Sequence, residues 1–515
     1  MNWSEAGVID SRFLQTCDIR ADEFKLEPFV MVIFGGRGDL SRRKLLPALY
    51  HLFREKELVD FAVLGFGEPP ADDGQYREMM KEALLTHDTE GYEEKKWEEF
   101  GRHLFFLSGV FEEEKNYRRL QEKIDSIGIV APGGAKNVIY YLAVPPQEAP
   151  VIVEKLKKFN LCRETYGAKI IVEKPFGHDL RSARELNRIL NDAFDEDQIY
   201  RIDHYLGKDP VQNIIFFRFS NAIFEEIWNR RYIDNVQITV AEEIGIDNRG
   251  AFYESAGVVR DIVQNHVMQL FGLVAMEAPI AFKADFIREE KLKILRSVRP
   301  MSDEYIAEYT ARGQYGPGRI RGERVPAYRE EEKVSPRSNI PTFFAGRFYV
   351  DNLRWAGVPF YIRTGKRMAR RVTEICLQLK QLPLRLFGRT CDVAEPDVLI
   401  LTIQPDEKIA LRFGVKYPYS ENQIYPVSMV FSYKEVFQTK IHPPYERLLM
   451  DCMKGDLTLF VREDAVEEMW AIVDPIISWW ENTPPDDFPN YRAGEWGPPE
   501  AQRLLERDAR RWLTA

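Results

Sequence analysis

The stretch FVMVIFGGRGDLSRRKL, residues 29–45, joins an unbroken apolar run to a glycine-rich turn and a charged segment. A continuous apolar run of this length is typical of a strand buried on both faces of a parallel sheet. Gly35, Gly36 and Gly38 then allow the chain to turn tightly, and the apolar residues that follow recur at helical spacing. The stretch therefore predicts the first strand, turn and helix of a doubly wound α/β domain.

Strand and helix patterns alternate from about residue 28 to about residue 200, which indicates a parallel sheet with helices on both faces. After Arg201 apolar runs follow one another without regular helical crossovers, which favours a large, mainly antiparallel sheet flanked by helices. The further strand candidates are FAVLGFG (61–67), HLFFLSG (103–109), KNVIYYLAVPP (136–146) and AKIIVEKPFG (168–177) in the first part, and YIDNVQITVAEEIG (232–245), TFFAGRFYVDN (342–352), VTEICLQLK (372–380), DVLILTIQP (397–405) and KIALRFGV (408–415) in the second.

These patterns divide the chain into an N-terminal extension over 1–27, an α/β domain over 28–202 and a larger domain over 203–515. The polar, turn-rich segment 312–340 is predicted to be a long excursion or a flexible loop. Helices are expected over VRDIVQNHVMQLFGLVAMEAP (259–279) and PPYERLLMDCMKG (443–455).

The composition is that of a soluble globular protein. Its 515 residues are 45% hydrophobic and 30% charged, which excludes disorder on a large scale. The net charge of −10 excludes general electrostatic recruitment to nucleic acid or to an anionic membrane. No apolar segment is long enough to span a bilayer, and the first residues lack a signal peptide pattern. The five scattered cysteines lack metal-binding or redox spacing, so we expect reduced thiols in a cytoplasmic protein.

The glycine turn indicates a dinucleotide site. Glycines at the first strand-to-helix junction let the backbone approach a pyrophosphate, whose charge the free N–H groups of the helix stabilise. The spacing is not G-x-G-x-x-G, and a tight turn that binds no ligand is equally consistent with it. Its position at the start of an alternating half-chain favours the dinucleotide.

The choice of dinucleotide depends on Glu68, which follows the second predicted strand. A carboxylate there accepts hydrogen bonds from a ribose diol and repels a 2′-phosphate, which favours NAD. Arg37 in the glycine turn, with Arg42 and Arg43 close behind it, offers a cationic clamp for the same phosphate. An ion pair between Arg37 and Glu68, or a surface role for Arg42 and Arg43, is the alternative.

A second group of charged residues, RIDHYLGK (201–208), lies at the predicted seam between the domains. It resembles the signature of the glucose-6-phosphate dehydrogenase family. The other motifs that carry the resemblance occur in consistent order from about residue 28 to the C-terminus. They are GGRGDLSRRKLLPALY (35–50), YLAVPP (141–146), EKPFG (173–177), IWNRRYI (227–233), RDIVQNH (260–266), GVPFYIRTGKR (357–367), PPYERLLMDCMKGD (443–456) and WGPPEA (496–501).

The resemblance implies a fold and a reaction. The fold is a Rossmann-like dinucleotide-binding domain followed by a larger α+β domain that binds substrate and whose antiparallel sheet usually forms the dimer face. The reaction is oxidation of glucose 6-phosphate with NADP to 6-phosphogluconolactone and NADPH, the entry step of the oxidative pentose phosphate pathway. Members of the family are usually homodimers or homotetramers.

The resemblance also implies roles for individual residues. His266 would be the base that removes the C1 hydroxyl proton, and Asp203 would orient its ring and stabilise the imidazolium. His204, Tyr205 and Lys208 would hold the substrate phosphate. Lys174, whose bond to Pro175 is a candidate for the cis form, would lie between sugar and nicotinamide. The further substrate residues would be Glu242, Asp261, Lys366 and Arg371, and the coenzyme residues Gly35, Gly36, Arg37, Gly38, Asp39, Leu40, Glu68, Pro145 and Lys174.

Several positions depart from the family pattern. Arg37 replaces a small residue, and Glu68 stands where NADP users usually have an arginine, so NADP is the family default and NAD or dual use is the alternative. Asp209 replaces a glutamate. Val372 and Thr402 stand where mammalian members have the basic residues of a second, structural NADP site, so we expect no second nucleotide, and we expect no metal.

Two other functions are open to the same sequence. A dehydrogenase for another sugar or for an inositol shares the two-domain plan and the EKP motif, and phosphate dependence of the activity distinguishes it. A catalytically silent homologue would act as an assembly subunit. The presence of Asp203, His266 and Lys174 together argues against the silent homologue.

Overall fold

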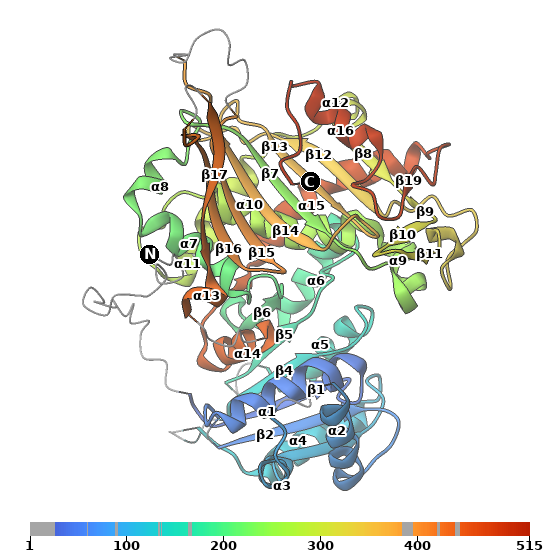
Figure 1. Ribbon diagram of the computed structural model, residues 1–515. Helices are drawn as coiled ribbons and strands as arrows, with labels where there is room; N and C mark the ends of the chain where they lie inside the picture. The colour runs from blue at the N-terminus through green and yellow to red at the C-terminus, as the bar shows by residue number, and fades with distance from the viewer. Residues whose placement is uncertain are drawn as a thin grey trace.

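The computed structural model describes residues 26–514 with short gaps (Figure 1). Two sets of expectations lie outside the described residues. They concern residues 1–25, which include Cys17, and Cys391. No helix in the described part of the chain is long and apolar enough to cross a membrane. The gaps are residues 59, 88–90, 132–133, 135, 163–166, 384–394, 420–422 and 438–442.

The first domain is built on a seven-stranded sheet in the order β18-β6-β5-β4-β1-β2-β3, at the bottom of Figure 1. Strands β1 to β6 pair in parallel, and this order is that of a doubly wound dinucleotide-binding fold. The strands are β1 (Phe29–Phe34), β2 (Phe61–Gly67), β3 (Leu104–Ser108), β4 (Val138–Leu142), β5 (Lys169–Val172), β6 (Ile199–Ile202) and β18 (Phe460–Val461). All six residues of β1 are buried, as its apolar sequence predicts.

Helices cover both faces of this sheet. They are η3 (Ser41–Leu45), α1 (Leu46–Arg54), α2 (Asp73–His87), α3 (Glu94–Gly101), α4 (Glu114–Ile127), α5 (Glu148–Lys158), α6 (Leu180–Ala193) and η4 (Glu196–Gln198). The helix expected after the glycine turn begins as the π-helical segment η3 and continues as α1, with Pro47 in the first turn of α1.

The second domain contains an eight-stranded sheet in the order β17-β16-β15-β14-β7-β13-β12-β8. Its pairs are antiparallel except β7 with β13, so the predicted mainly antiparallel sheet is confirmed. The strands are β7 (Ile233–Ala241), β8 (Thr310–Gly313), β12 (Phe343–Phe348), β13 (Phe360–Gly365), β14 (Val372–Leu379), β15 (Val398–Gln404), β16 (Lys408–Lys416) and β17 (Ile424–Ser432).

The second part of the chain contributes further helices, several of which contact this sheet. They are α7 (Asp209–Phe219), α8 (Ala222–Ile227), η5 (Asp247–Arg249), α9 (Gly250–Val258), η6 (Val259–Val267), α10 (Met268–Ala275), α11 (Ala284–Arg296), α12 (Asp303–Tyr309), η7 (Tyr328–Glu330), α13 (Tyr433–Phe437), α14 (Pro444–Lys454), α15 (Glu463–Asn482) and α16 (Pro499–Glu506). The helix expected over 259–279 consists of the π-helical segment η6 and of α10. Insertions of π-helical geometry occur frequently at functional sites.

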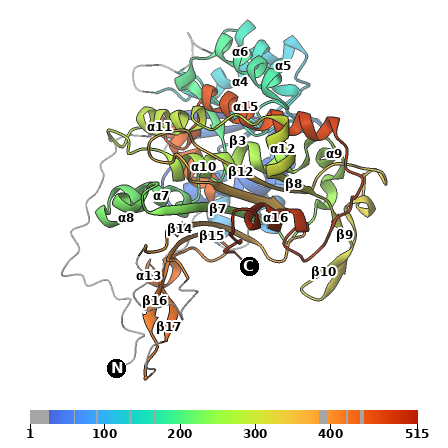
Figure 2. The same cartoon turned by 90° about the horizontal axis from the view of Figure 1, so that it is seen from above.

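The C-terminal part of the chain returns to the first domain. Strand β18 pairs with β6 antiparallel, and α14 packs on α1. Helix α15 contacts α6 of the first domain and α12 of the second, and Figure 2 shows it lying between them. A segment late in the chain thus completes the first sheet. The division of the chain at residue 202 stays a prediction.

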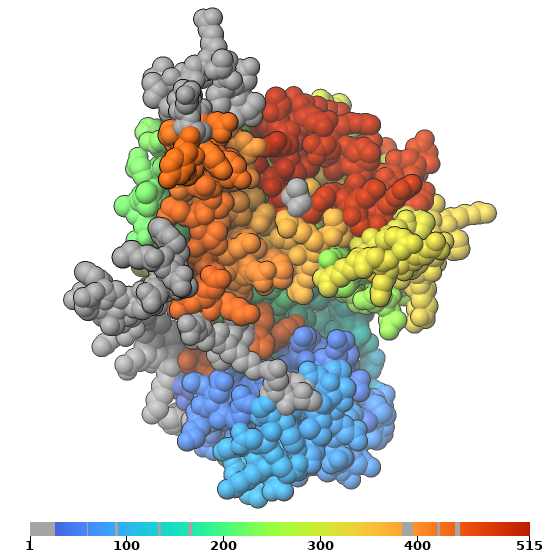
Figure 3. All heavy atoms as spheres, in the orientation of Figure 1, coloured from blue at the N-terminus to red at the C-terminus, as the bar shows by residue number. Residues whose placement is uncertain are grey.

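The segment 312–340 is an excursion with secondary structure of its own. It contains β9 (Tyr315–Gly316), which pairs with β19 (Tyr491–Arg492), and the hairpin of β10 (Gly318–Ile320) and β11 (Glu323–Val325). The hairpin projects from the domain in Figure 2, and the segment is yellow in Figure 3. The buried side chain of Gln314 donates to the backbone oxygens of Ser338 and Ile340. The predicted excursion is therefore confirmed, and the flexibility of this segment stays a prediction.

Candidate active site

His266 and Asp203 form a buried pair at the seam of the two domains. His266 lies in the last turn of η6, and Asp203 directly follows β6. The Nδ1 of His266 lies 2.5 Å from Oδ1 of Asp203, and both side chains are about 2% exposed. Burial acts to raise the pKa of Asp203, but the charge and hydrogen bond of His266 outweigh it, so this pKa lies below its ordinary value. The ionised carboxylate fixes the ring with its Nδ1 proton toward Asp203.

Lys174 occupies the other side of the same ring. It follows β5, and its Nζ lies 3.0 Å from Nε2 of His266 and 3.1 Å from the backbone oxygen of Asp261. Its bond to Pro175 is cis, as the sequence suggested. Burial lowers the pKa of His266 below 6.5; the nearby charge of Asp203 acts to raise it and that of Lys174 to lower it. His266 is therefore a neutral imidazole near neutral pH, with Nε2 as an acceptor.

Two carboxylates and a lysine lie beside Lys174. Glu242 follows β7 and Lys366 follows β13, and these parallel neighbours end side by side because Ala241 is paired with Gly365. The Nζ of Lys366 forms an ion pair with Glu242 and lies 3.6 Å from Oδ2 of Asp261. Burial acts to raise the pKa of Asp261, but Lys174 and Lys366 hold it below its ordinary value. The cluster offers charged acceptors and donors suited to a polyhydroxylated ligand.

Two cations, Lys208 and Arg371, converge on Gln404 near the histidine. Lys208 donates from Nζ to Oε1 of Gln404 at 2.8 Å, and Nη2 of Arg371 lies 3.4 Å from the same oxygen. Burial, and then the charge of Arg371, lower the pKa of Lys208 to about 8. Two cations that share one neutral acceptor provide excess positive charge for an anionic ligand.

Tyr205 and His204 connect the cations to the histidine. The Tyr205 ring is stacked on the His266 ring with centroids 4.3 Å apart, and Nζ of Lys208 lies 3.9 Å from the Tyr205 centroid. The His204 ring lies edge-on to His266 at 4.5 Å, and burial lowers the pKa of His204. The structure thus brings all ten predicted catalytic and substrate residues into one contact network.

Asp203, His204 and His266 also lie close enough together to be considered as metal ligands, because their ligand atoms are within 4.8 Å of one another. The hydrogen bond between Nδ1 of His266 and Oδ1 of Asp203 occupies one possible ligand atom of each of these two residues.

Sequence analysis missed Gln404, which completes the cationic group. It is the last residue of β15, and its Nε2 donates to Oγ1 of Thr373 at 2.9 Å. No sequence motif marks an amide at the end of an apolar strand. Its position before Pro405 was the available signal, since a polar residue at a strand end is often functional.

The glycine turn lies at the carboxyl ends of β1 and β2. Gly35 has a φ of +76°, and a Cβ there would lie 2.3 Å from the backbone oxygen of Ala143. A Cβ on Gly36 would lie 2.6 Å from Cα of Gly65, so close packing demands both glycines. A Cβ on Gly38 would meet two backbone oxygens and no other heavy atom within 4 Å. This open side of the turn fits the approach of a pyrophosphate.

Arg37 is held at the end of β2 by backbone oxygens. Its Nη1 donates to Pro69 at 2.6 Å and lies 3.4 Å from the oxygen of Pro70, next to exposed Glu68. The alternative of an ion pair between Arg37 and Glu68 is wrong, because the carbonyl groups take the guanidinium instead. Asp39 forms an exposed ion pair with Arg43 at 3.5 Å. Both Arg37 and Glu68 are thus placed where the ribose of a dinucleotide lies in this fold.

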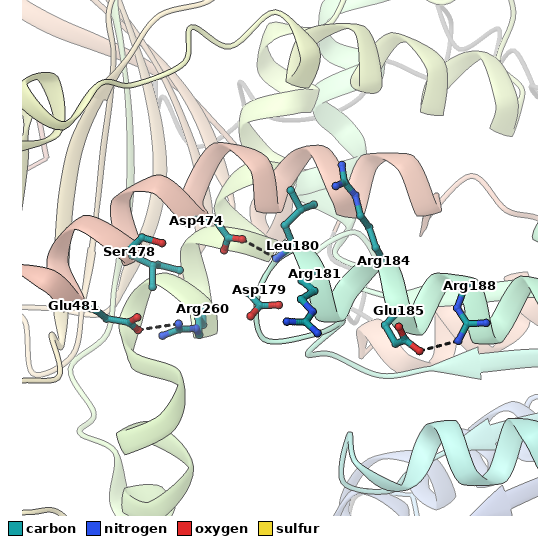
Figure 4. Close-up of a pocket in the computed structure, with 11 residues that line it drawn as sticks. Asp179, Leu180, Arg181, Arg184, Glu185, Arg188, Arg260, Asp474, Ser478 and Glu481 are labelled. Carbon is teal, nitrogen blue, oxygen red and sulfur yellow. Dashed lines mark hydrogen bonds and ion pairs between the residues drawn. The ribbon is translucent and has the colours of Figure 1, made fainter.

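A cleft of about 1070 Å³ connects predicted coenzyme and substrate residues. Pro145, which follows β4, and Lys174, Asp261 and Asn265 line it. A second hollow of about 570 Å³ lies between α6 and α15 (Figure 4). Three arginines that line it form ion pairs within the protein, Arg184 with Glu467, Arg188 with Glu185 and Arg260 with Glu481, and it holds none of the predicted site residues.

The fold and this cleft define the class of two-domain, nicotinamide-dependent dehydrogenases. Residues 32–213 match the family model described as glucose-6-phosphate dehydrogenase, NAD binding domain, and residues 215–513 match glucose-6-phosphate dehydrogenase, C-terminal domain. The chain belongs to the glucose-6-phosphate dehydrogenase family.

Individual relatives agree with the family models. A glucose-6-phosphate 1-dehydrogenase of Chlamydia pneumoniae is 44% identical over 495 residues, covering 94% of this chain and 96% of the relative. A solved glucose-6-phosphate dehydrogenase in complex with its substrate glucose-6-phosphate superposes with a TM-score of 0.85 at 32% identity, covering 95% of this chain and 99% of the other. The enzyme of Mycobacterium avium superposes with a TM-score of 0.80 at 36% identity, over 95% and 99% of the chains.

Proposed function

We propose that this protein oxidises glucose 6-phosphate at C1 to 6-phosphogluconolactone and transfers the hydride to a nicotinamide coenzyme, as the entry step of the oxidative pentose phosphate pathway. The observation that carries the proposal is the His266 ring, which contacts Asp203 through Nδ1 and Lys174 through Nε2. A buried, oriented and neutral imidazole is the base that oxidation of a hydroxyl group requires.

In the proposed mechanism, Nε2 of His266 accepts the proton of the C1 hydroxyl as hydride leaves C1. Asp203 stabilises the imidazolium that forms, because its carboxylate already accepts the hydrogen bond from Nδ1. Lys174 orients the C1 oxygen beside Nε2. The coenzyme supplies the hydride acceptor when it is bound.

Two groups of residues around His266 would hold the sugar hydroxyls and the phosphate. Glu242 and Asp261, which pair with Lys366, would accept hydrogen bonds from the hydroxyls. Lys208, Arg371, His204 and Tyr205 would bind the phosphate, with Gln404 completing the group. A dianion bound in a protein of net charge −10 requires such local charge-assisted donors.

The pH dependence of substrate binding tests the phosphate assignment. The pKa of Lys208 is about 8, so the free protein loses this charge as the pH rises through 8. The dianion is expected to bind the charged form much more tightly than the neutral form. We expect KM for glucose 6-phosphate to rise about tenfold per pH unit above this value. Lys208→Arg should keep KM nearly flat over the same range, since arginine stays charged. A wild-type KM independent of pH would remove Lys208 from the phosphate site.

For the coenzyme we propose NADP, with some use of NAD. The glycine turn and Pro145 would hold the dinucleotide, with Asp39 and Leu40 at the start of the helical segment. Arg37 would face the 2′-phosphate, because Pro69 and Pro70 hold its guanidinium at the end of β2. Glu68 lies beside it and would weaken the preference. We keep the expectation that no second nucleotide binds at Val372 and Thr402.

Replacement of Arg37 by alanine is expected to lower kcat/KM for NADP about thirtyfold and to leave kcat/KM for NAD within about twofold. A charge-assisted hydrogen bond of about 2 kcal/mol accounts for this difference. Steady-state rates with both coenzymes measure it. Glu68→Gln is the matched variant and should raise the NADP to NAD ratio. Equal losses with both coenzymes in Arg37→Ala would assign Arg37 to the turn alone.

We further propose a homodimer or homotetramer assembled through the large sheet. Met429 and Val430, on the edge strand β17, are both exposed apolar residues and lie on opposite faces of the strand. They support this assembly, because an exposed apolar edge strand can pack against a second copy. The buried thiols of Cys376 and Cys452 support a reducing compartment such as the cytoplasm.

A further inference from the structure

Glu173, which directly precedes Lys174, lies in a hydrogen-bonded group with no role in the mechanism above. Its Oε1 accepts from the hydroxyl of Tyr141 at 2.5 Å and from the hydroxyl of Tyr445 at 3.2 Å. Tyr141 lies in β4, which neighbours β5, whereas Tyr445 lies in α14 and is separated from Glu173 by 272 residues in sequence. One carboxylate oxygen thus joins two sheet strands to a distant helix.

Both tyrosines are suited to act as fixed donors. Burial raises the pKa of Tyr141 and of Tyr445 well above the ordinary value, so each hydroxyl keeps its proton over the working pH range. Burial also raises the pKa of Glu173, while the two hydroxyl groups act to lower it. The hydrogen bonds therefore hold the Glu173 side chain in one position whichever form it takes.

Helix α14, which carries Tyr445, is fixed independently at both of its ends. Lys169 of β5 donates from Nζ to the backbone oxygens of Cys452 and Met453, each at 2.9 Å. Oε1 of Glu446 is hydrogen-bonded to Nδ1 of His51, in α1, at 2.7 Å. These contacts fix the position of α14, and therefore also the position of residues that its side chains bind.

The same helix also touches the segment that carries Asp203 and Lys208. A Cβ on Gly207 would lie 2.7 Å from the backbone oxygen of Pro444, the first residue of α14. Close approach of α14 thus explains the glycine within RIDHYLGK. The helix contacts both segments that deliver side chains to His266, the one after β5 and the one after β6.

We propose that Tyr445, acting through Glu173, is a positioning residue that holds Lys174 Nζ against Nε2 of His266. The inference rests on the proposed function, because it concerns the placement of the proposed catalytic group. Glu173 anchors the backbone at the residue before Lys174, and Tyr445 anchors Glu173 to α14. Loss of the hydroxyl frees Lys174 to move while the charges of the site stay unchanged.

The test is Tyr445→Phe, which removes one hydroxyl and changes no charge. The charged and titratable groups that face His266 are Asp203, His204, Tyr205, Lys174 and Asp261. Because Lys174 acts to lower the pKa of His266, a less ordered Lys174 should let this pKa rise. We expect kcat to fall about fivefold and the acid limb of kcat/KM to move to higher pH by about half a unit.

Glu446→Gln is the matched control, because it alters the neighbouring residue of the same helix but its partner is His51. It is expected to lower Tm while leaving the acid limb in place. Tyr141→Phe, which removes the other donor to Glu173, is expected to shift the limb in the same direction as Tyr445→Phe. A Tyr445→Phe protein with an unchanged acid limb, or a Glu446→Gln protein with an equal shift, would overturn the inference.

NMR titration of the His266 imidazole gives the same information without turnover. If the wild-type protein does not oxidise glucose 6-phosphate, the proposed function fails, and the pKa of His266 in Tyr445→Phe still decides the positioning role. A rise relative to wild type supports it, and an unchanged pKa in a folded variant contradicts it. If Tyr445→Phe does not fold, Tyr141→Phe is measured in its place.

Discussion

The variant His266→Asn is expected to turn over glucose 6-phosphate about a thousandfold more slowly than the wild type, with KM changed less than about threefold. A positioned general base contributes about 10² to 10⁴ in rate, and the asparagine amide cannot accept the C1 proton. The loss is expected in kcat, because the residues that would hold the sugar and the phosphate are retained. Steady-state kinetics at saturating coenzyme measures both constants.

His51→Asn is the matched control for this experiment. His51 is also buried and hydrogen-bonded to a carboxylate, that of Glu446, but it lies in α1 and outside the contact network of the site. The His51→Asn protein is expected to be less stable, with a lower Tm, and to keep kcat within about threefold of the wild type. Turnover by His266→Asn within tenfold of the wild type would remove His266 from the role of base.

Replacement of Lys208 by alanine is expected to lower kcat/KM for glucose 6-phosphate about a hundredfold, mainly through KM. The ammonium group is partly buried beside Tyr205 and has Gln404 as its acceptor, so a bound phosphate gains a charge-assisted hydrogen bond of about 3 kcal/mol. Free glucose lacks the phosphate, and its much smaller kcat/KM should change less than about threefold.

The comparison of the two sugars separates phosphate binding from a general effect on the site. Arg371→Ala should act in the same direction as Lys208→Ala, because both cations reach the same oxygen of Gln404. Equal fractional losses on glucose and on glucose 6-phosphate would show that Lys208 supports the fold of the site and does not bind the phosphate.

Local patterns were sufficient to predict the parallel strands and the glycine turn of the first domain. The apolar run 29–34 followed by Gly35 and Gly36 marks a buried strand and a tight turn, and both occur as expected. The return of β18 to this sheet was not predictable, because two residues carry no periodicity. The packing of α14 against Gly207 likewise depends on a contact between distant segments.

The candidate site came from the resemblance more than from residue patterns. A single buried histidine such as His266 is usually structural, and only the joint motifs distinguished it. The structure adds the geometry that no motif contains: the contact of Nδ1 with Asp203, of Nε2 with Lys174, and of two cations with Gln404. Tyr445 lies inside a recognised motif, yet its contact with Glu173 is visible only in three dimensions.

The most direct test of the account is the initial rate of nicotinamide reduction by the wild-type protein, with glucose 6-phosphate and free glucose compared at equal concentrations of NADP. The account predicts rapid NADPH formation with glucose 6-phosphate and a kcat/KM for free glucose lower by at least about a hundredfold. Equal kcat/KM for the two sugars, or no reduction of NADP or NAD with glucose 6-phosphate, would contradict it.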